Sequence, residues 1–232
     1  MDTIGHAALI SVGMIFSGDP SLYSALRTSL AVSLTATVLA CALGVPLGAL
    51  LSMRDFRGRR VVLVAVNALL GLPPVVIGLA LYLLLSRAGP LGSWGLLFTT
   101  KAMVLAQFLL ALPIIVALAH RATETSWKEF GDALRIDGAS VVRCIGFLLR
   151  LESAALATTF LAAFGRAIAE VGAIMIVGGN IRDDTRTLTT AIVLETSKGN
   201  MPVALGLGIV LVAVTLVVSG IAISLQSRLA RR

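Results

Sequence analysis

The chain of 232 residues is 57% hydrophobic and only 13% charged, and its mean hydropathy is +0.97. These values exclude an ordinary soluble domain and predict one integral membrane domain without a separate globular module. The net charge of +7 is then expected to come from basic loops at one membrane face, so nucleic acid is not an expected partner.

The N-terminal residues 1–27 are predicted to form an external or interfacial segment. Residues 4–16 (IGHAALISVGMIF) are apolar but too short to span a bilayer, and the polar stretch SGDPS follows them. A sixth, tilted span across this region is the alternative.

Five later segments are apolar enough to cross a membrane as helices, which takes about 20 residues each. The predicted spans are residues 28–53, 61–86, 102–119, a fourth that begins after Glu152, and 202–227. The sequence therefore predicts an all-α integral membrane protein with about five transmembrane helices. Helix breakers within these spans, such as GVPLG and GLPP, indicate close helix packing or a water-filled path.

Basic residues divide unequally between the two sets of connections. Twelve Arg and Lys lie in the 54–60 loop, the 120–152 loop and the C-terminal end, against six on the other side. Because cytoplasmic loops carry the excess of positive charge, the N-terminus is predicted outside and the C-terminus in the cytoplasm. Residues 229–232 would then form a basic cytoplasmic tail.

The predicted cytoplasmic loop contains the polar stretch EFGDALRIDGAS at residues 129–140. Its spacing predicts a short amphipathic helix that ends at Gly138, because glycine tolerates the left-handed conformation that closes helices. Ser140 is placed to cap a second helix. Two short helices beneath the membrane suit docking into a groove on another protein, and an ordinary solvated loop is the alternative.

The fourth span carries two ionisable residues, Arg166 and Glu170, four positions apart. On a continuous helix they would face each other, and charged groups inside a membrane are usually paired or face a cavity. The sequence therefore predicts an ion pair, with Arg166 as an attractor of a passing anion as the alternative.

The loop at 129–140 resembles the "EAA" loop of ABC-importer permeases, which reads E-A-A-x-x-x-G. The chain departs from that pattern by Asp132 in place of Glu and Leu134 in place of Ala, and it lacks the Leu-Pro ending that follows. The resemblance implies a loop that couples the permease to a cytoplasmic ATP-hydrolysing subunit. The residues implied are Glu129, Asp132, Ala133, Leu134, Gly138, Ala139 and Ser140.

Residues 166–173 (RAIAEVGA), 178–200 and GDPSLY at 18–23 resemble the permeases for sulfate, molybdate and tungstate, and are most similar to tungstate permease subunits. The resemblance implies the ABC transmembrane type-1 (MetI-like) fold over residues 28–228. It implies a homodimer in a bacterial or archaeal plasma membrane, surrounded by lipid, that passes tungstate from an extracytoplasmic binding protein. Molybdate and sulfate are the alternative substrates. The residues expected at the path or gate are Arg166, Glu170, Gly172, Asn180, Thr187 and Thr189.

The stretch TRTLTTAI at 185–192 lies on the predicted external side. Its hydroxyl groups and two nearby arginines could receive an oxyanion, but Asp183 and Asp184 beside them would repel it. We therefore expect a solvated re-entrant loop that touches the binding protein.

The sequence lacks the GxxxxGK[ST] phosphate-binding loop, so the chain is not expected to bind ATP or to be an enzyme by itself. It also lacks metal-ligand spacings, and no cofactor is expected. A stand-alone anion channel or secondary carrier is the alternative class, although the chain shows no convincing internal repeat.

Overall fold

The computed structural model describes Gly13 and residues 18–229, and the regular structure of these residues is helical. The predictions for residues 4–16, including the sixth span, lie outside this part of the chain. The elements are α2 (Pro20–Met53), α3 (Arg59–Leu69), α4 (Pro74–Leu85), η1 (Gly92–Trp94), α5 (Thr100–Ile136), α6 (Val141–Leu151), α7 (Ser153–Ile168), α8 (Gly172–Gly178), α9 (Leu188–Ser197) and α10 (Met201–Leu229).

Three described helices, α2, α5 and α10, are each long and apolar enough to cross a membrane alone. Two bent pairs, α3 with α4 and α6 with α7, could each supply one more span, which gives up to five. The prediction of an all-α membrane protein is confirmed. The predicted second span at 61–86 corresponds to α3 and α4 together, and the chain turns by 99° between these two helices. Pro73 and Pro74 stand at this turn, at the start of α4. The first N–H groups of a helix have no partner within the helix, so proline, which lacks this group, is tolerated there.

The α2 helix begins at Pro20, eight residues before the predicted span, because Asp19 caps it. The Asp19 carboxylate accepts hydrogen bonds from the backbone N–H groups of Ser21 (2.8 Å) and Leu22 (3.2 Å). The hydroxyl group of Ser21 also donates to this carboxylate and lowers the pKa of Asp19. The cap therefore stays ionised at the positive end of the helix dipole.

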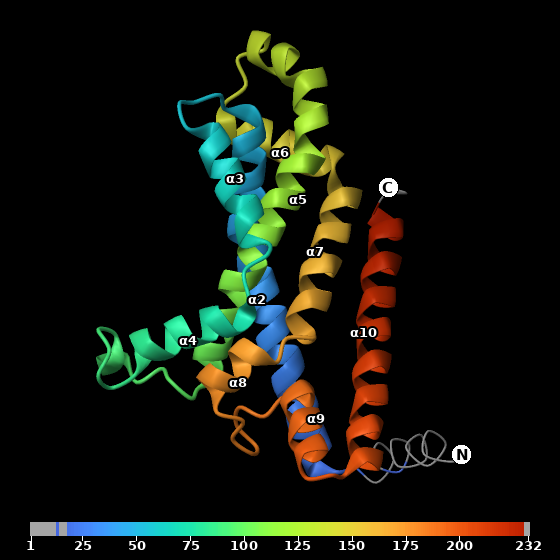
Figure 1. The fold of residues 1–232 in the computed structure, drawn as a ribbon. Coiled ribbons are helices and arrows are strands. Elements are labelled where there is room, and N and C mark those ends of the chain that lie inside the picture. The colour runs from blue at the N-terminus through green and yellow to red at the C-terminus, as the bar shows by residue number, and fades with distance from the viewer. Residues whose placement is uncertain (1–12, 14–17, 230–232) are drawn as a thin grey trace.

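Helices α2 and α5 form the central pair of the molecule (Figure 1) and touch closely at Gly48. A Cβ atom at Gly48 would lie 2.7 Å from the Cβ of Ala119 and 2.7 Å from the backbone oxygen of Val116. Gly44, one turn earlier, faces Ile115 in the same way. The small residues of GVPLG thus permit backbone contact, as their GxxxG spacing indicated.

Two further clusters hold the other helices to this pair. At one, α4 and α8 pack on α2 and α5 through Val32, Leu81, Leu85, Met103 and Ile174. At the other, α9 and α10 pack on the start of α2 through Leu22, Leu188, Leu207 and Val210. Figure 1 shows that α4 projects at a steep angle from the long helices, with α8 beside it.

Candidate functional site

The turn between α5 and α6 has the geometry that its glycine predicts. Gly138 has a φ of +65°, its N–H donates to the oxygen of Arg135 (3.1 Å), and the N–H of Ala139 donates to the oxygen of Leu134 (3.0 Å). These two bonds form a Schellman motif. The Ser140 hydroxyl then accepts from the N–H of Arg143, so the predicted N-cap of α6 is confirmed. The predicted short helix was wrong in one respect, because it continues the third span as one helix of 37 residues.

The residues expected in the coupling loop lie together at this helix end. Leu134 and Ala139 are half-buried against a cluster of Met53, Cys144 and Leu148. The exposed members are Glu129, Asp132, Ala133, Gly138 and Ser140.

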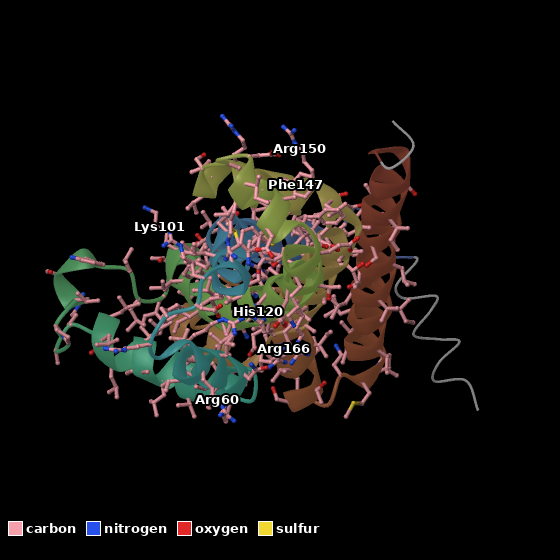
Figure 2. The ribbon with its side chains drawn as sticks, turned by 90° about the horizontal axis from the view of Figure 1, so that it is seen from above. Arg60, Lys101, His120, Phe147, Arg150 and Arg166 are labelled. Atoms are coloured by element: carbon pink, nitrogen blue, oxygen red, sulfur yellow. The ribbon has the colours of Figure 1, made fainter. Side chains whose placement is uncertain are left out.

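Sequence reasoning did not single out the apolar side chains exposed around this turn. Ile136 is 86% exposed, Val142 is 80% exposed, and Phe147 on α6 is 38% exposed. Figure 2 shows Phe147 and Arg150 at the rim of the molecule. Apolar residues in a loop that was predicted to be cytoplasmic were the signal that could have found them. Together they form a surface suited to a partner protein.

Hydrogen bonds tie the base of this turn to the neighbouring helices. The hydroxyl group of Ser126 on α5 donates to the carboxylate of Glu152, which stands at the 79° bend between α6 and α7. The hydroxyl group of Thr123 donates to the hydroxyl oxygen of Ser52 at the end of α2 (3.0 Å). These bonds fix the bend between α6 and α7, and the end of α2, to α5.

The predicted ion pair between Arg166 and Glu170 was wrong. Helix α7 ends at Ile168, so the two residues do not share a helical face, and the ion pairs among the described residues include neither. The Arg166 side chain is exposed, whereas Glu170 is 5% exposed and its Oε1 accepts from the N–H of Ala173 (3.1 Å). Glu170 therefore stabilises the first turn of α8 instead.

The break between α7 and α8 is held by side chains from other helices. The Nε2 of Gln107 on α5 donates to the oxygen of Ala167 (2.8 Å), and the hydroxyl group of Thr189 on α9 donates to the oxygen of Glu170 (3.0 Å). Backbone carbonyl groups at a helix end lose their i+4 partners and need others within a membrane; the oxygen of Ala167 also accepts from the N–H of Glu170 (3.1 Å). Gly172 completes the joint, because a Cβ there would lie 2.8 Å from a methyl group of Val75 on α4.

The threonines of the predicted external loop are buried, so the expectation of a solvated loop was wrong. Thr185, Thr187, Thr189 and Thr190 are at most 5% exposed. Thr187 and Thr190 form a capping box at the start of α9. Each hydroxyl group replaces water as a partner for nearby backbone, which lets the chain re-enter the protein.

Asn180, also expected at the path, turns the chain after α8 instead. Its φ is +52°, and its Oδ1 accepts from the Nε of Arg186 (3.2 Å). Between residues 180 and 190, the exposed residues are 181–184, at the tip of the loop.

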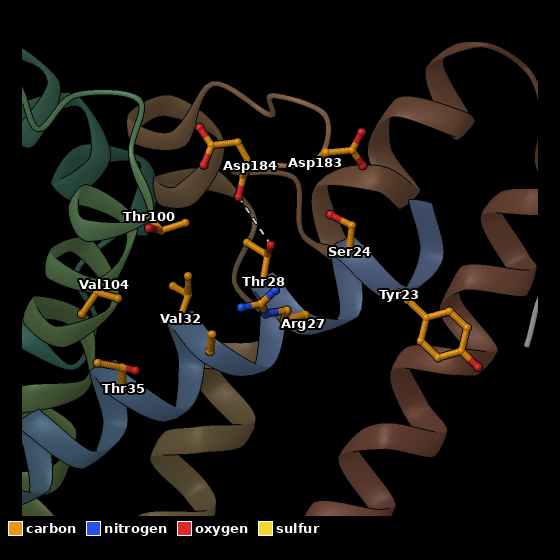
Figure 3. A pocket seen from close by; sticks show the side chains of 11 residues that line it. Tyr23, Ser24, Arg27, Thr28, Val32, Thr35, Thr100, Val104, Asp183 and Asp184 are labelled. Carbon is orange, nitrogen blue, oxygen red and sulfur yellow. Dashed lines mark hydrogen bonds between the residues drawn. The ribbon is translucent and has the colours of Figure 1, made fainter. Parts of the chain in front are cut away.

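A polar pocket of about 580 Å³ opens beneath this tip (Figure 3). The hydroxyl group of Thr28 on α2 donates to the backbone oxygen of Asp184 (3.4 Å) across its edge. The lining mixes one arginine, several hydroxyl groups and two carboxylates; its polar members are Tyr23, Ser24, Arg27, Thr28, Thr35, Thr100, Asp183 and Asp184. Sequence reasoning noted the two carboxylates but missed Arg27, Thr35 and Thr100, which lay inside or beside spans.

Residues 44–232 match the family described as "Binding-protein-dependent transport system inner membrane component". The match covers most of the chain, including the turn at Gly138 and the break at Glu170. The chain belongs to this family. It is therefore a multi-pass membrane permease component, and the fold that the resemblance to oxyanion permeases implied is confirmed.

The chain is similar over most of its length to several permeases. It is 41% identical over 212 residues to a "Probable anion ABC transporter permease protein" of Haloferax volcanii, with 89% of this chain and 91% of the relative covered. It is 36% identical over 226 residues to the "Tungstate uptake system permease protein TupB" of Peptoclostridium acidaminophilum, with 97% and 99% covered. The protein of the same name from Campylobacter jejuni is 40% identical over 201 residues, with 87% and 84% covered.

Proposed function

We propose that the chain is the permease subunit of an ATP-driven importer that moves tungstate through a gated path between two copies of itself. Its similarity to two tungstate uptake permeases supports the substrate. A cytoplasmic ATPase and an extracytoplasmic binding protein are the partners. By itself the chain hydrolyses nothing; it converts the movement of the ATPase into opening and closing of the path.

The observation that carries this proposal is the exposed apolar surface at the Gly138 turn. Ile136 and Val142 project from the end of α5 and the start of α6. In a cytoplasmic turn these side chains would lie beyond the reach of lipid tails, so a partner protein is what would cover them. An ATPase that binds here moves α6, which is joined to α7 through the single residue Glu152, and the hydrogen bond from Ser126 to Glu152 couples this joint to α5.

The exposed face of α7 supports a path between two copies. Its exposed residues are small or charged, namely Ser153, Ala154, Thr158, Ala162 and Arg166. The exposed residues of α10 are bulky and apolar, such as Leu216 and Ile221, as lipid contact favours. An arginine facing hydrocarbon is costly, so the α7 face lines water or a second copy. Arg166 there attracts the oxyanion, while Gln107, Glu170, Gly172 and Thr189 hold the broken helix beside it.

The positions of the basic connections support the proposed orientation. The 54–58 connection, the Gly138 turn and the end of α10 share one end of the molecule, and α2 begins at the other (Figure 1). We assign the first end to the cytoplasm, with 120–152 as the coupling loop, 28–228 as the permease domain and 229–232 as the tail. Residues 1–27 and the buried Thr187 region then belong to the external side.

The proposal is tested by cellular tungsten and molybdenum, measured by mass spectrometry at trace supply of both oxyanions. The gene is deleted, then restored as wild type or as the Gly138→Leu variant. We expect tungsten to fall on deletion and to return only with the wild type. Unchanged tungsten after deletion would contradict the proposal.

A molybdate importer is the second candidate. The "Molybdenum transport system permease protein ModB" of Mycobacterium tuberculosis is 32% identical over 212 residues, with 87% of this chain and 79% of the relative covered. In the same experiment, a loss of molybdenum larger than the loss of tungsten would favour it.

A further inference from the structure

Helix α3 is attached to the molecule by polar contacts near its two ends. At the first end, the Nε of Arg59 donates to the oxygen of Leu51 (2.9 Å), and its Nη2 lies 3.2 Å from the Nε2 of His120. Near the other end, the Nη2 of Arg121 donates to the Oδ1 of Asn67 (3.1 Å). No residue of α3 is buried. The apolar middle of this helix is therefore held near α2 and α5 without being packed into them.

A groove of about 720 Å³ separates α3 from α2 and α5. Its lining is almost wholly apolar, with Leu50, Leu51, Val62, Val66 and Leu112 as examples. Protein interiors are packed as densely as organic crystals, so a space of this size between helices requires an occupant. Because α2 and α5 are membrane-spanning, the groove lies at the depth of lipid acyl chains.

Positive charge gathers where the groove meets the connection between α2 and α3. Arg54, Asp55 and Phe56 line this end of the groove. Residues 54–60 carry four arginines against the single Asp55, whose Oδ1 lies 4.0 Å from the Nε of Arg59. Arg60 is exposed at the edge of the molecule in Figure 2, but it does not line the groove, so Arg54 is the arginine at the groove end. Basic residues at the cytoplasmic end of membrane helices attract anionic headgroups.

We propose that this groove binds one anionic phospholipid, with an acyl chain between α3 and α5 and the phosphate beside Arg54, which lines the groove end. The apolar lining accounts for the chain, and the arginines account for the preference for a negative headgroup. The lipid supplies the packing that α3 lacks. Its assignment to the cytoplasmic leaflet rests on the orientation proposed above, but the binding itself does not depend on transport.

The test compares thermal unfolding of the purified protein in detergent with added phosphatidylglycerol or phosphatidylcholine of identical acyl chains. A ligand that binds only the folded state raises the Tm, so phosphatidylglycerol is expected to raise it more than phosphatidylcholine. Val66→Trp fills the groove and is expected to abolish the difference. Val64→Trp is the matched control, because Val64 lies on the same helix, is 62% exposed and does not line the groove.

The headgroup is tested with Arg54→Gln, which removes the arginine that lines the groove and is expected to lose the difference. Arg87→Gln removes the same charge at a residue that does not line the groove and is expected to keep it. Equal Tm values with both lipids in the wild type overturn the proposal, as does a difference that survives in either the groove or the arginine variant. If Val66→Trp instead converts a dimer to a monomer in mass photometry, a second copy fills the groove and the proposal is also overturned. None of these outcomes depends on whether tungstate is the substrate.

Discussion

Single residues decide what the two ends of α5 can do. Gly138 at one end adopts a conformation that is costly for residues with a Cβ, and a Cβ there would meet no atom within 4 Å. Glycine is therefore favoured at position 138 by the backbone conformation and not by a lack of space for a side chain. Near the other end, Gln107 spans the gap to the broken helix α7 with one hydrogen bond. Gly138 thus sets the direction of α6, and Gln107 holds the end of α7 in place.

Two substitutions of Gly138 distinguish the effect of its backbone conformation from the effect of adding a side chain. Gly138→Leu is expected to cost about 1 kcal/mol of stability, because leucine disfavours a positive φ. We expect it to reduce tungsten uptake at least tenfold, because the turn and its exposed surface shift. Gly138→Asn is the control, since asparagine tolerates this conformation, and it is expected to keep most of the uptake. Normal uptake by a folded Gly138→Leu protein would contradict the coupling role.

Arg166 is expected to act through its charge and not through a partner carboxylate. Arg166→Gln should lower uptake at least tenfold, and Arg166→Lys should retain more of it. Because Glu170 binds the N–H of Ala173, exchanging Arg166 and Glu170 is not expected to rescue either single variant. Uptake assays on the four proteins check this. A rescue by the exchange would show that the two side chains pair during transport.

At the scale of the elements, the sequence predicted which segments are helical better than where the helices bend. Hydropathy found the spans of α2, α5 and α10, and the glycine and serine around residue 139 predicted both helix ends. The sequence did not indicate that α7 ends at Ile168, because the neighbouring Ala167, Ala169 and Glu170 are good helix formers. That break depends on Gln107 and Thr189, which are distant in sequence and satisfy its carbonyl groups. The predicted ion pair failed for the same reason.

The contact of α2 with α5 is expected to depend on Gly48. Gly48→Ala places a methyl group against the backbone of α5, so the helices must separate, at a cost of about 1–3 kcal/mol. Gly208→Ala on α10 is the control, because a Cβ there meets nothing within 4 Å. Thermal unfolding in detergent should show a lower Tm for the first variant alone. Equal Tm values would mean that the two helices tolerate greater separation.

At the scale of the whole molecule, the exposed surface has two characters. Bulky apolar side chains cover α4 and the outer face of α10, whereas small and charged ones cover one face of α7. A sequence pattern gives the composition of each helix but not which face remains uncovered after folding. The α7 face was therefore out of reach before the structure, although Arg166 within it was singled out.

Cross-linking tests whether the α7 face meets a second copy. In a protein with Cys41 and Cys144 replaced by alanine, Thr158→Cys is expected to form disulfide-linked dimers in membranes. The control is Leu216→Cys, because Leu216 on α10 is 67% exposed. This variant is expected to remain monomeric under the same oxidant. The product is read by non-reducing gel electrophoresis. Dimers only with Leu216→Cys would place the α10 face between the copies.

The continuous α5 helix has a mechanical consequence. Its 37 residues measure about 55 Å, nearly twice the hydrocarbon thickness of about 30 Å. The backbone contact at Gly48 falls beside Ala119, about 26 Å from Ile136 and about 18 Å from Gln107. Any rigid tilt of α5 about that contact is therefore the motion of a lever on a pivot. It moves the tip at Ile136 and the joint at Gln107 in opposite directions, the tip by roughly half as much again.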